Sequence, residues 1–286
     1  MQKKKILLPL LLLAPAFLAH QAYADEQVAT EPSQEVAAVT SAQEGNVPDG
    51  AIDTSAQGKE SASGQQNDLL EANIIHTNDV HGRIVEEKGV IGDAKLAAVI
   101  EEERKNNPST LVVDAGDAFQ GLPISNSSKG EERAKLLNEM GYDAMAVGNH
   151  EFDFGLDEAK KYKEILNFPL LSSNTYVNGA RLFEASTIVD KDKNVVGDEF
   201  VVIGVTTPET ATKTHPKNVQ GVTFKDPISE VNSVIDEVEA RAAAEGKTYK
   251  NYVVLAHLGV DTTTPVEWRG STLAEALSNN PKLKGK

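Results

Sequence analysis

The stretch "AVGNHEFDFG" at residues 146–155 decides how this chain is interpreted. It ends an apolar run and then places an amide, an imidazole and two carboxylates within five positions, at Asn149, His150, Glu151 and Asp153. Charged and polar groups beside a buried strand cost free energy unless they are paired or hold a ligand. We therefore expect this strand end to lie in a functional site.

Three other apolar runs end in a similar way: "IIHTNDVHGR" at 74–83, "VVDAGDAFQG" at 112–121 and "VVLAHLG" at 253–259. Each is followed by a residue that can bind a metal, close to a glycine. In open α/β sheets, sites form just beyond the carboxyl ends of the strands. We therefore expect one rim to collect five candidate metal ligands, Asp79, His81, Asp117, Asn149 and His257.

From Leu69 onward, short apolar runs alternate with helical patterns, which predicts an α/β domain. The expected strands are Ala72–His76, Thr110–Asp114, Ala144–Val147, Pro169–Ser172, Phe200–Val205 and Tyr252–Ala256. The expected helices are Asp93–Lys105, with Leu96, Val99 and Ile100 on one face, then Glu131–Met140, ending at Gly141, and Ile228–Glu245, with a stripe of Ile228, Val231, Val234, Ile235 and Val238.

The composition excludes several classes of site. The chain has 286 residues, of which 40% are hydrophobic, a formal net charge of −15 and no cysteine. Without cysteine there is no disulfide, thiolate metal site or cysteine nucleophile. A strongly acidic chain is a poor partner for a nucleic-acid polymer, whose phosphates need basic patches. A nucleotide substrate stays possible, because a bound metal supplies positive charge locally.

The N-terminal residues have the pattern of an export signal. Lys3–Lys5 precede an apolar run at Ile6–Leu18, and Ala22–Ala24 matches a small-residue cleavage site, so we expect a signal peptide at 1–24. The run is too short and too interrupted by proline to favour a membrane span. Asp25–Asp68 carries nine acidic residues and one lysine and contains no aromatic residue, which predicts a disordered acidic spacer.

The candidate ligands indicate the kind of metal site. Imidazole, carboxylate and amide donors suit zinc, manganese or iron, and two carboxylates from different strands suit a two-metal centre that clamps a phosphoryl group. His150 follows a candidate ligand and is expected to face the substrate, with Asp153 holding its other ring nitrogen. We expect Glu151 to hydrogen-bond the turn, His76 to lie within the first strand, and His215 to face solvent.

Together the four motifs resemble the signature blocks of the calcineurin-like metallophosphoesterases. More narrowly, they resemble the secreted bacterial 5′-nucleotidase and 2′,3′-cyclic-nucleotide phosphodiesterase family, as does "GVTTPETATKTHPKNVQGVTF" at 204–224. The resemblance covers 69–286 and implies a fold of two packed, mostly mixed sheets flanked by helices.

The resemblance also implies roles. Asp79 and His81 would bind one metal, Asn149 and His257 a second, and Asp117 would bridge the two, with zinc or manganese as the ions. His150 would stabilise charge on the transferring phosphoryl group, and Asp153 would orient it.

The family supplies two further ligands from a Gly-His-x-His block and grips the nucleoside with a C-terminal domain. No histidine follows His257 in this sequence. We therefore expect 69–286 to be a catalytic domain that lacks its last strands and the nucleotide-specificity domain.

The leading hypothesis is a secreted or cell-surface, two-metal hydrolase of nucleotide phosphate esters, of the 5′-nucleotidase type. Two alternatives stay open. In the first, the substrate would be a cyclic-nucleotide diester or a sugar nucleotide. In the second, the chain would be a non-catalytic surface protein that binds a ligand or a host molecule.

Overall fold

The computed structural model describes residues 37–38, 72–191, 193, 195 and 197–286. The expected signal peptide at 1–24 lies outside these residues. So does the expected spacer at 25–68, apart from Ala37–Ala38, and both stay predictions. Among the described helices, none has the length and apolar character needed to cross a bilayer.

The first sheet brings the carboxyl ends of four strands to one edge. Its strand order is β1-β2-β3-β4-β5, with β2 to β5 parallel and β1 antiparallel to β2. Parallel neighbours need crossover connections, which here contain helices. The strands are β1 (Ala37–Ala38), β2 (Asn73–Thr77), β3 (Thr110–Asp114), β4 (Ala144–Ala146) and β5 (Leu170–Leu171), and the helices between them are α1 (Asp93–Asn106), α2 (Pro123–Asn126), α3 (Glu131–Met140) and α4 (Leu156–Ile165).

The second sheet has the order β11-β9-β8, with β11 parallel and β8 antiparallel to β9. A third, small antiparallel sheet has the order β10-β6-β7 and shares no strand with the second sheet. It was not expected from the sequence. The strands are β6 (Thr175–Val177), β7 (Ala180–Arg181), β8 (Ser186–Val189), β9 (Phe200–Thr206), β10 (Val222–Phe224) and β11 (Asn251–His257). The remaining helices are η1 (His150–Phe152), α5 (Thr210–Lys213), η2 (Pro216–Val219), α6 (Pro227–Ala244), η3 (Val266–Trp268), α7 (Gly270–Ser278) and η4 (Pro281–Leu283).

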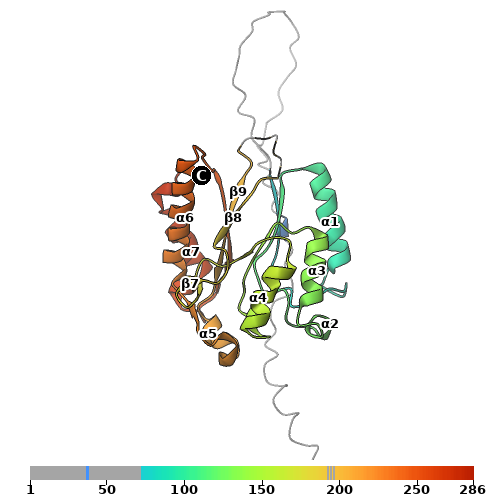
Figure 1. The fold of residues 1–286 in the computed structure, drawn as a ribbon. Coiled ribbons are helices and arrows are strands. Elements are labelled where there is room, and N and C mark those ends of the chain that lie inside the picture. Colours follow the sequence, from blue (N-terminus) through green and yellow to red (C-terminus); the bar gives the residue numbers. More distant parts are fainter. Residues whose placement is uncertain (1–36, 39–71, 192, 194, 196) are drawn as a thin grey trace, which may run out of the picture. The chain divides into compact units, whose positions relative to one another are not determined.

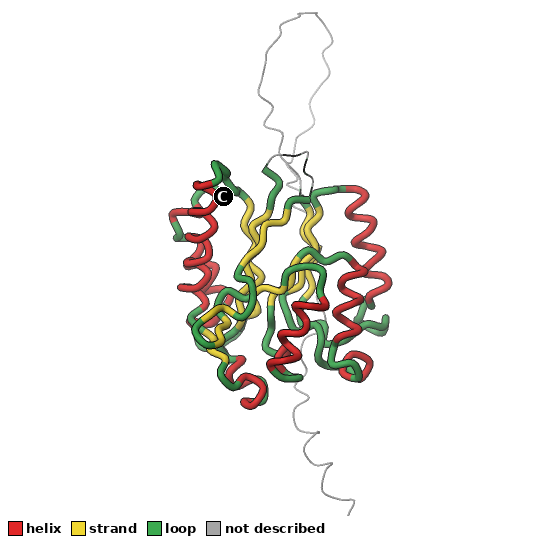
Figure 2. The backbone as a smooth tube through the Cα atoms, in the orientation of Figure 1, coloured by secondary structure: helices red, strands yellow, loops and turns green. Residues whose placement is uncertain are grey.

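Alternating side chains on the strands build the layers. On β3, Leu111 and Val113 join the cluster between the two large sheets, and Val112 joins the cluster beneath α1, α3 and α4. On β9, Val202 faces the first sheet while Val201 packs with residues of α6. Because both faces of these strands are buried, they read as continuous apolar runs. Figures 1 and 2 show α1, α3 and α4 on one side of the strands and α6 and α7 on the other.

The expected two-sheet α/β sandwich flanked by helices is therefore confirmed. Thr110–Asp114 and Glu131–Met140 have the expected bounds. One helical face was wrong: Val99 is 39% exposed, whereas Leu96 and Ile100 are buried. Ala97 packs against the core cluster instead, because its small side chain lies on the side of α1 that faces Met140 at the end of α3.

Candidate metal and catalytic site

The sequence-predicted ligands lie at the carboxyl ends of four strands. Asp79 and His81 follow β2, Asp117 follows β3, Asn149 follows β4, and His257 is the last residue of β11. This edge of the sheets is at the lower end of Figure 1, where α2 and α5 also lie. The topology thus brings together residues that are as many as 178 positions apart (257 − 79 = 178).

Asp79, His81 and Asp117 form one group, in which one ligand atom from each lies within 4.8 Å of the others. All three have left-handed backbone, with φ of 52°, 49° and 61°. This conformation costs a non-glycine residue about 1–3 kcal/mol and persists only where the surroundings enforce it. Two hydrogen bonds do so here, from Asp79 N to Gly116 O (2.9 Å) and from His81 N to Asp117 O (3.0 Å).

The ring of His81 is oriented by a backbone carbonyl. Its Nδ1 lies 3.1 Å from Gln120 O, and since a carbonyl only accepts, Nδ1–H is the donor. The other nitrogen, Nε2, lies 3.9 Å from Asp79 Oδ1. A histidine that donates through one ring nitrogen to a carbonyl presents the other as a metal ligand.

Asp117, Asn149 and His257 form a second, more buried group. His257 Nε2 lies 3.2 Å from Asp117 Oδ2 and 3.0 Å from Asn149 Oδ1, and its Nδ1 donates to Ala115 O at 2.9 Å. Burial disfavours a charged imidazole, but the Asp117 carboxylate outweighs it and raises the pKa of His257 to about 10. In the metal-free protein, the proton on His257 Nε2 therefore lies between oxygen lone pairs of Asp117 and Asn149 that would point at a metal ion if one were bound.

Glu151 joins the loops that carry these ligands. Its Oε2 accepts from Asp117 N (2.8 Å) and Gly148 N (2.7 Å), and its Oε1 accepts from Ala118 N (2.9 Å). The side chain is completely buried. The expectation that Glu151 bonds the turn is therefore confirmed. Gly148 leaves the required space, since a Cβ there would lie 2.1 Å from Asp117 Oδ1.

His150 lies beside the ligands rather than among them. Its backbone N–H donates to Asp117 Oδ1 at 2.8 Å, and its ring is 5.2 Å from that of His81, nearly perpendicular to it at 76°. Nδ1 contacts Asp153 Oδ2 at 2.6 Å. Burial opposes protonation of this ring, but the Asp153 and Asp117 carboxylates prevail and raise the pKa of His150 to about 9. The ring therefore carries a positive charge at neutral pH in the metal-free protein.

Three positions that sequence reasoning missed support the site. Asp114 is buried between the ends of β2 and β3, where Oδ1 accepts from Gly116 N (2.7 Å) and Oδ2 contacts Thr77 Oγ1 (2.5 Å). Thr214 and Asn218 both bond Asp153. Asp114 stands inside a quoted motif, and the other two stand inside 204–224, but no spacing signals these contacts. His76 lies in β2 and His215 is exposed, as expected.

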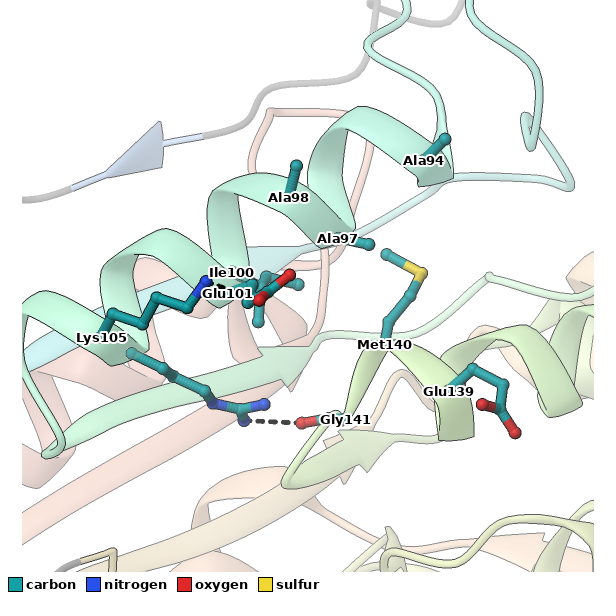
Figure 3. A pocket seen from close by; sticks show the side chains of 10 residues that line it. Ala94, Ala97, Ala98, Ile100, Glu101, Lys105, Glu139, Met140 and Gly141 are labelled. Atoms are coloured by element: carbon teal, nitrogen blue, oxygen red, sulfur yellow. Dashed lines mark hydrogen bonds and ion pairs between the residues drawn. The ribbon is translucent and has the colours of Figure 1, made fainter.

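A hollow of about 600 Å³ lies elsewhere, between α1 and the end of α3. Figure 3 shows Ala94, Ala97 and Ala98 of α1 on one side of it and Met140 on the other. None of the candidate ligands lines it. On one side the hollow is bounded by Arg104, which donates a hydrogen bond to Gly141 O at 2.6 Å, rather than by a cluster of side chains suited to catalysis.

The donor set fits divalent metal ions. Carboxylate, amide and imidazole donors converge, both histidines have one nitrogen fixed by a carbonyl, and the shared carboxylate of Asp117 lies in both groups. The strained backbone at three of the residues is further support, since such strain gathers at ligand sites.

Known proteins are similar to this chain in sequence and in fold. A 5′-nucleotidase from Vibrio cholerae is 40% identical over 175 residues, covering 59% of this chain and 31% of that relative. A 5′-nucleotidase from Bos taurus is 36% identical, covering 59% of this chain and 32% of that relative. Among solved structures, the calcineurin-like phosphoesterase YfkN from Bacillus subtilis matches with a TM-score of 0.56 and 27% identity, covering 66% of this chain and 62% of that one.

The chain thus spans about a third of the length of the curated relatives it matches. The family model for calcineurin-like phosphoesterases matches residues 72–284, which include every candidate ligand. Since this match covers most of the chain and the α/β fold agrees with it, the chain belongs to the calcineurin-like phosphoesterase family.

Proposed function

We propose that this chain carries the catalytic site of an exported, two-metal hydrolase of nucleotide phosphate esters, of the 5′-nucleotidase type. The observation that carries the proposal is the position of Asp117. Its carboxylate belongs to the group with Asp79 and His81 and also lies 3.2 Å from His257 Nε2. A carboxylate common to two ligand groups fits a two-metal site, in which two neighbouring ions act on one phosphoryl group.

Each group would hold one ion, zinc or manganese. Asp79, His81 and Asp117 would hold the first, and Asp117, Asn149 and His257 the second. When bound, such ions polarise the phosphoryl group and neutralise its negative charge. The protein's contribution is to hold the donors in place, through left-handed backbone in the first group and through the Ala115 carbonyl in the second.

His150 would supply a further positive charge. Asp153 accepts a hydrogen bond from Nδ1–H, so the other ring N–H, at Nε2, is the one that would donate to a phosphoryl oxygen. A donor fixed in advance is most effective where negative charge develops in the transition state. The raised pKa of His150, about 9, keeps this proton on the ring at neutral pH.

The nucleotide substrate rests on the relatives, which are named as 5′-nucleotidases. Export rests on the sequence pattern at 1–24. The proposal therefore assigns the protein to the cell surface or to the medium, where it would release phosphate from nucleotides.

Phosphate release from AMP by the purified protein, with Mn²⁺ or Zn²⁺ added, tests the proposal. We expect release that stops with a chelator and is lost in His150→Ala, which keeps its metal because His150 is not a ligand. His215→Ala removes an exposed histidine and serves as the matched control.

Two other substrates, 2′,3′-cyclic AMP and a uridine diphosphate sugar, are tested beside AMP. Their hydrolysis gives a nucleoside monophosphate and no free phosphate, so the products are separated by chromatography. If either is hydrolysed faster than AMP, the preferred substrate is a cyclic diester or a nucleotide sugar rather than a nucleoside monophosphate. No hydrolysis of any of the three with either metal would overturn the proposal.

A further inference from the structure

The two carboxylate oxygens of Asp153 have different partners. Oδ2 contacts His150 Nδ1 at 2.6 Å, and Oδ1 accepts from the hydroxyl of Thr214 at 2.7 Å. The Thr214 residue is only 4% exposed. Thr214 is 61 positions away in sequence, so this bond joins a separate part of the chain to the candidate catalytic pair.

Thr214 stands on a fixed support, the segment 210–219, which comprises α5 and η2. From this segment Asn218 Nδ2 donates to Asp153 O at 2.8 Å, so backbone and side chain of Asp153 are both held. Val219 is buried in the same core cluster as Phe152, the residue before Asp153. The segment and the turn that carries His150 are therefore packed as one unit.

A carboxylate held by one bond has a poorly fixed plane, because the terminal torsion of aspartate is broad and roughly two-fold. With one oxygen on the ring of His150 alone, the plane of Asp153 could rotate and the ring would follow. A second bond, to the other oxygen, removes this freedom. The hydroxyl of Thr214 supplies that bond, to the oxygen that does not contact the ring.

We propose that Thr214 is a positioning residue: by holding Oδ1 of Asp153 it keeps Oδ2 on His150 and so aims Nε2 of His150 at the phosphoryl group. The proposal rests on the proposed function for its catalytic consequence. Its structural part, the fixed bond between His150 and Asp153, does not depend on a substrate or on a metal.

The test replaces Thr214 by valine, which keeps the shape and removes the hydroxyl. We expect kcat for AMP to fall about tenfold, because small misplacements of a catalytic group reduce rates strongly. We expect KM and metal affinity to change less than about twofold, since Thr214 belongs to neither candidate metal group and acts on His150 only through Asp153. Thr214→Ser retains the hydroxyl and restores kcat. Thr212→Val is the matched control, because that exposed hydroxyl of the same segment bonds Glu209 O.

Proton NMR of the metal-free protein gives an independent measurement. The Nδ1 proton of His150 is expected as a slowly exchanging downfield signal in the wild type and in Thr214→Ser. It is expected to broaden or disappear in Thr214→Val, or in Thr214→Ala if the valine variant does not fold.

An unchanged signal together with an unchanged kcat in Thr214→Val would overturn the positioning role. A wild type that releases no phosphate would overturn the proposed function, and the NMR comparison would still decide whether Thr214 holds the pair.

Discussion

The two ligand groups that share Asp117 are held in different ways. In the first group the side chains of Asp79 and His81 are 43% and 18% exposed, and the residues are positioned by left-handed backbone. In the second group His257 is 11% exposed and Asn149 is buried, and the side chains bond one another directly. The first group is thus shaped by its turns and the second by contacts between its own donors.

This difference indicates what each group needs from the metal. The buried group already satisfies its polar atoms, as buried polar atoms must, and a cation would replace a proton. The exposed group has solvent as an alternative partner, so the cation would displace water instead. His150 stands beside His81, so the candidate catalytic ring lies next to the more exposed of the two groups.

Asp117→Asn is expected to have the largest effect, because it changes the one residue common to both groups. Loss of a residue that only orients a metal ligand costs about 10–100-fold in affinity or activity, so we expect a loss of more than about 100-fold for this shared ligand. Metal content per chain and phosphate release measure it. Asp157→Asn, at a completely exposed aspartate, is the control. Full metal content in Asp117→Asn would show that the groups do not share this carboxylate.

Gly148→Ala tests the close approach on which both groups depend. An added Cβ would lie 2.1 Å from Asp117 Oδ1 and 2.7 Å from Asp117 N, so the loop after β3 must shift. Overpacking of this kind costs about 3 kcal/mol of unfolding free energy at the upper end of the usual range. Urea unfolding measures it. Gly270→Ala, where nothing lies within 4 Å of the added Cβ, is expected to be neutral or slightly stabilising. Equal stabilities would contradict the packing argument.

Much of the fold follows from local patterns in the sequence. The strand at Thr110–Asp114 is recognisable because its centre, Leu111–Val113, is a continuous apolar run, as expected of a strand buried on both faces. The helix at Glu131–Met140 is recognisable because Gly141 ends it, with φ of 75°. Patterns that depend on tertiary contacts were less informative. The strand expected over 169–172 is only Leu170–Leu171, since the register pairing with β4 is limited to those two residues.

The ligand rim could be predicted because parallel strands place their carboxyl ends together, whatever the rest of the chain does. The supporting contacts could not. Thr214 reaches Asp153 across 61 positions, and no periodicity relates the two. The left-handed backbone at Asp79 and His81 could not be predicted from the sequence either, because most aspartates and histidines have negative φ and the hydrogen bonds to Gly116 O and Asp117 O come from a distant loop. The metal and catalytic roles of these residues stay predictions.

His257→Ala and His81→Ala compare the two groups directly in metal-free protein. The first removes a buried ring that bonds Ala115 O and Asn149 Oδ1, so the variant leaves buried acceptors without a donor. We expect a loss of about 2 kcal/mol in unfolding free energy for His257→Ala and less than about 1 kcal/mol for His81→Ala, whose carbonyl partner can be solvated. Urea unfolding with a chelator present measures both. Equal losses would mean that the groups do not differ in how they are held.

Asp114→Asn is expected to have the smallest effect, and it concerns the carboxyl group behind both loops. Burial raises the pKa of Asp114 from 3.8 to about 8, against the opposing bonds from Thr77 and Gly116. The folded state then holds a proton that the unfolded state releases. The associated stability is complete below pH 3.8 and is lost as the pH rises toward 8.

Between pH 6 and pH 7 the metal-free wild type should lose at most about 1.4 kcal/mol of unfolding free energy from this group. Asp114→Asn keeps the shape, accepts from Gly116 N and cannot ionise, so its stability should change less over the same interval. Urea unfolding at the two pH values gives both slopes. Parallel slopes would mean that Asp114 is ionised in the folded protein, held charged by Thr77 and Gly116, and that the loops are joined by a carboxylate rather than by a neutral acid.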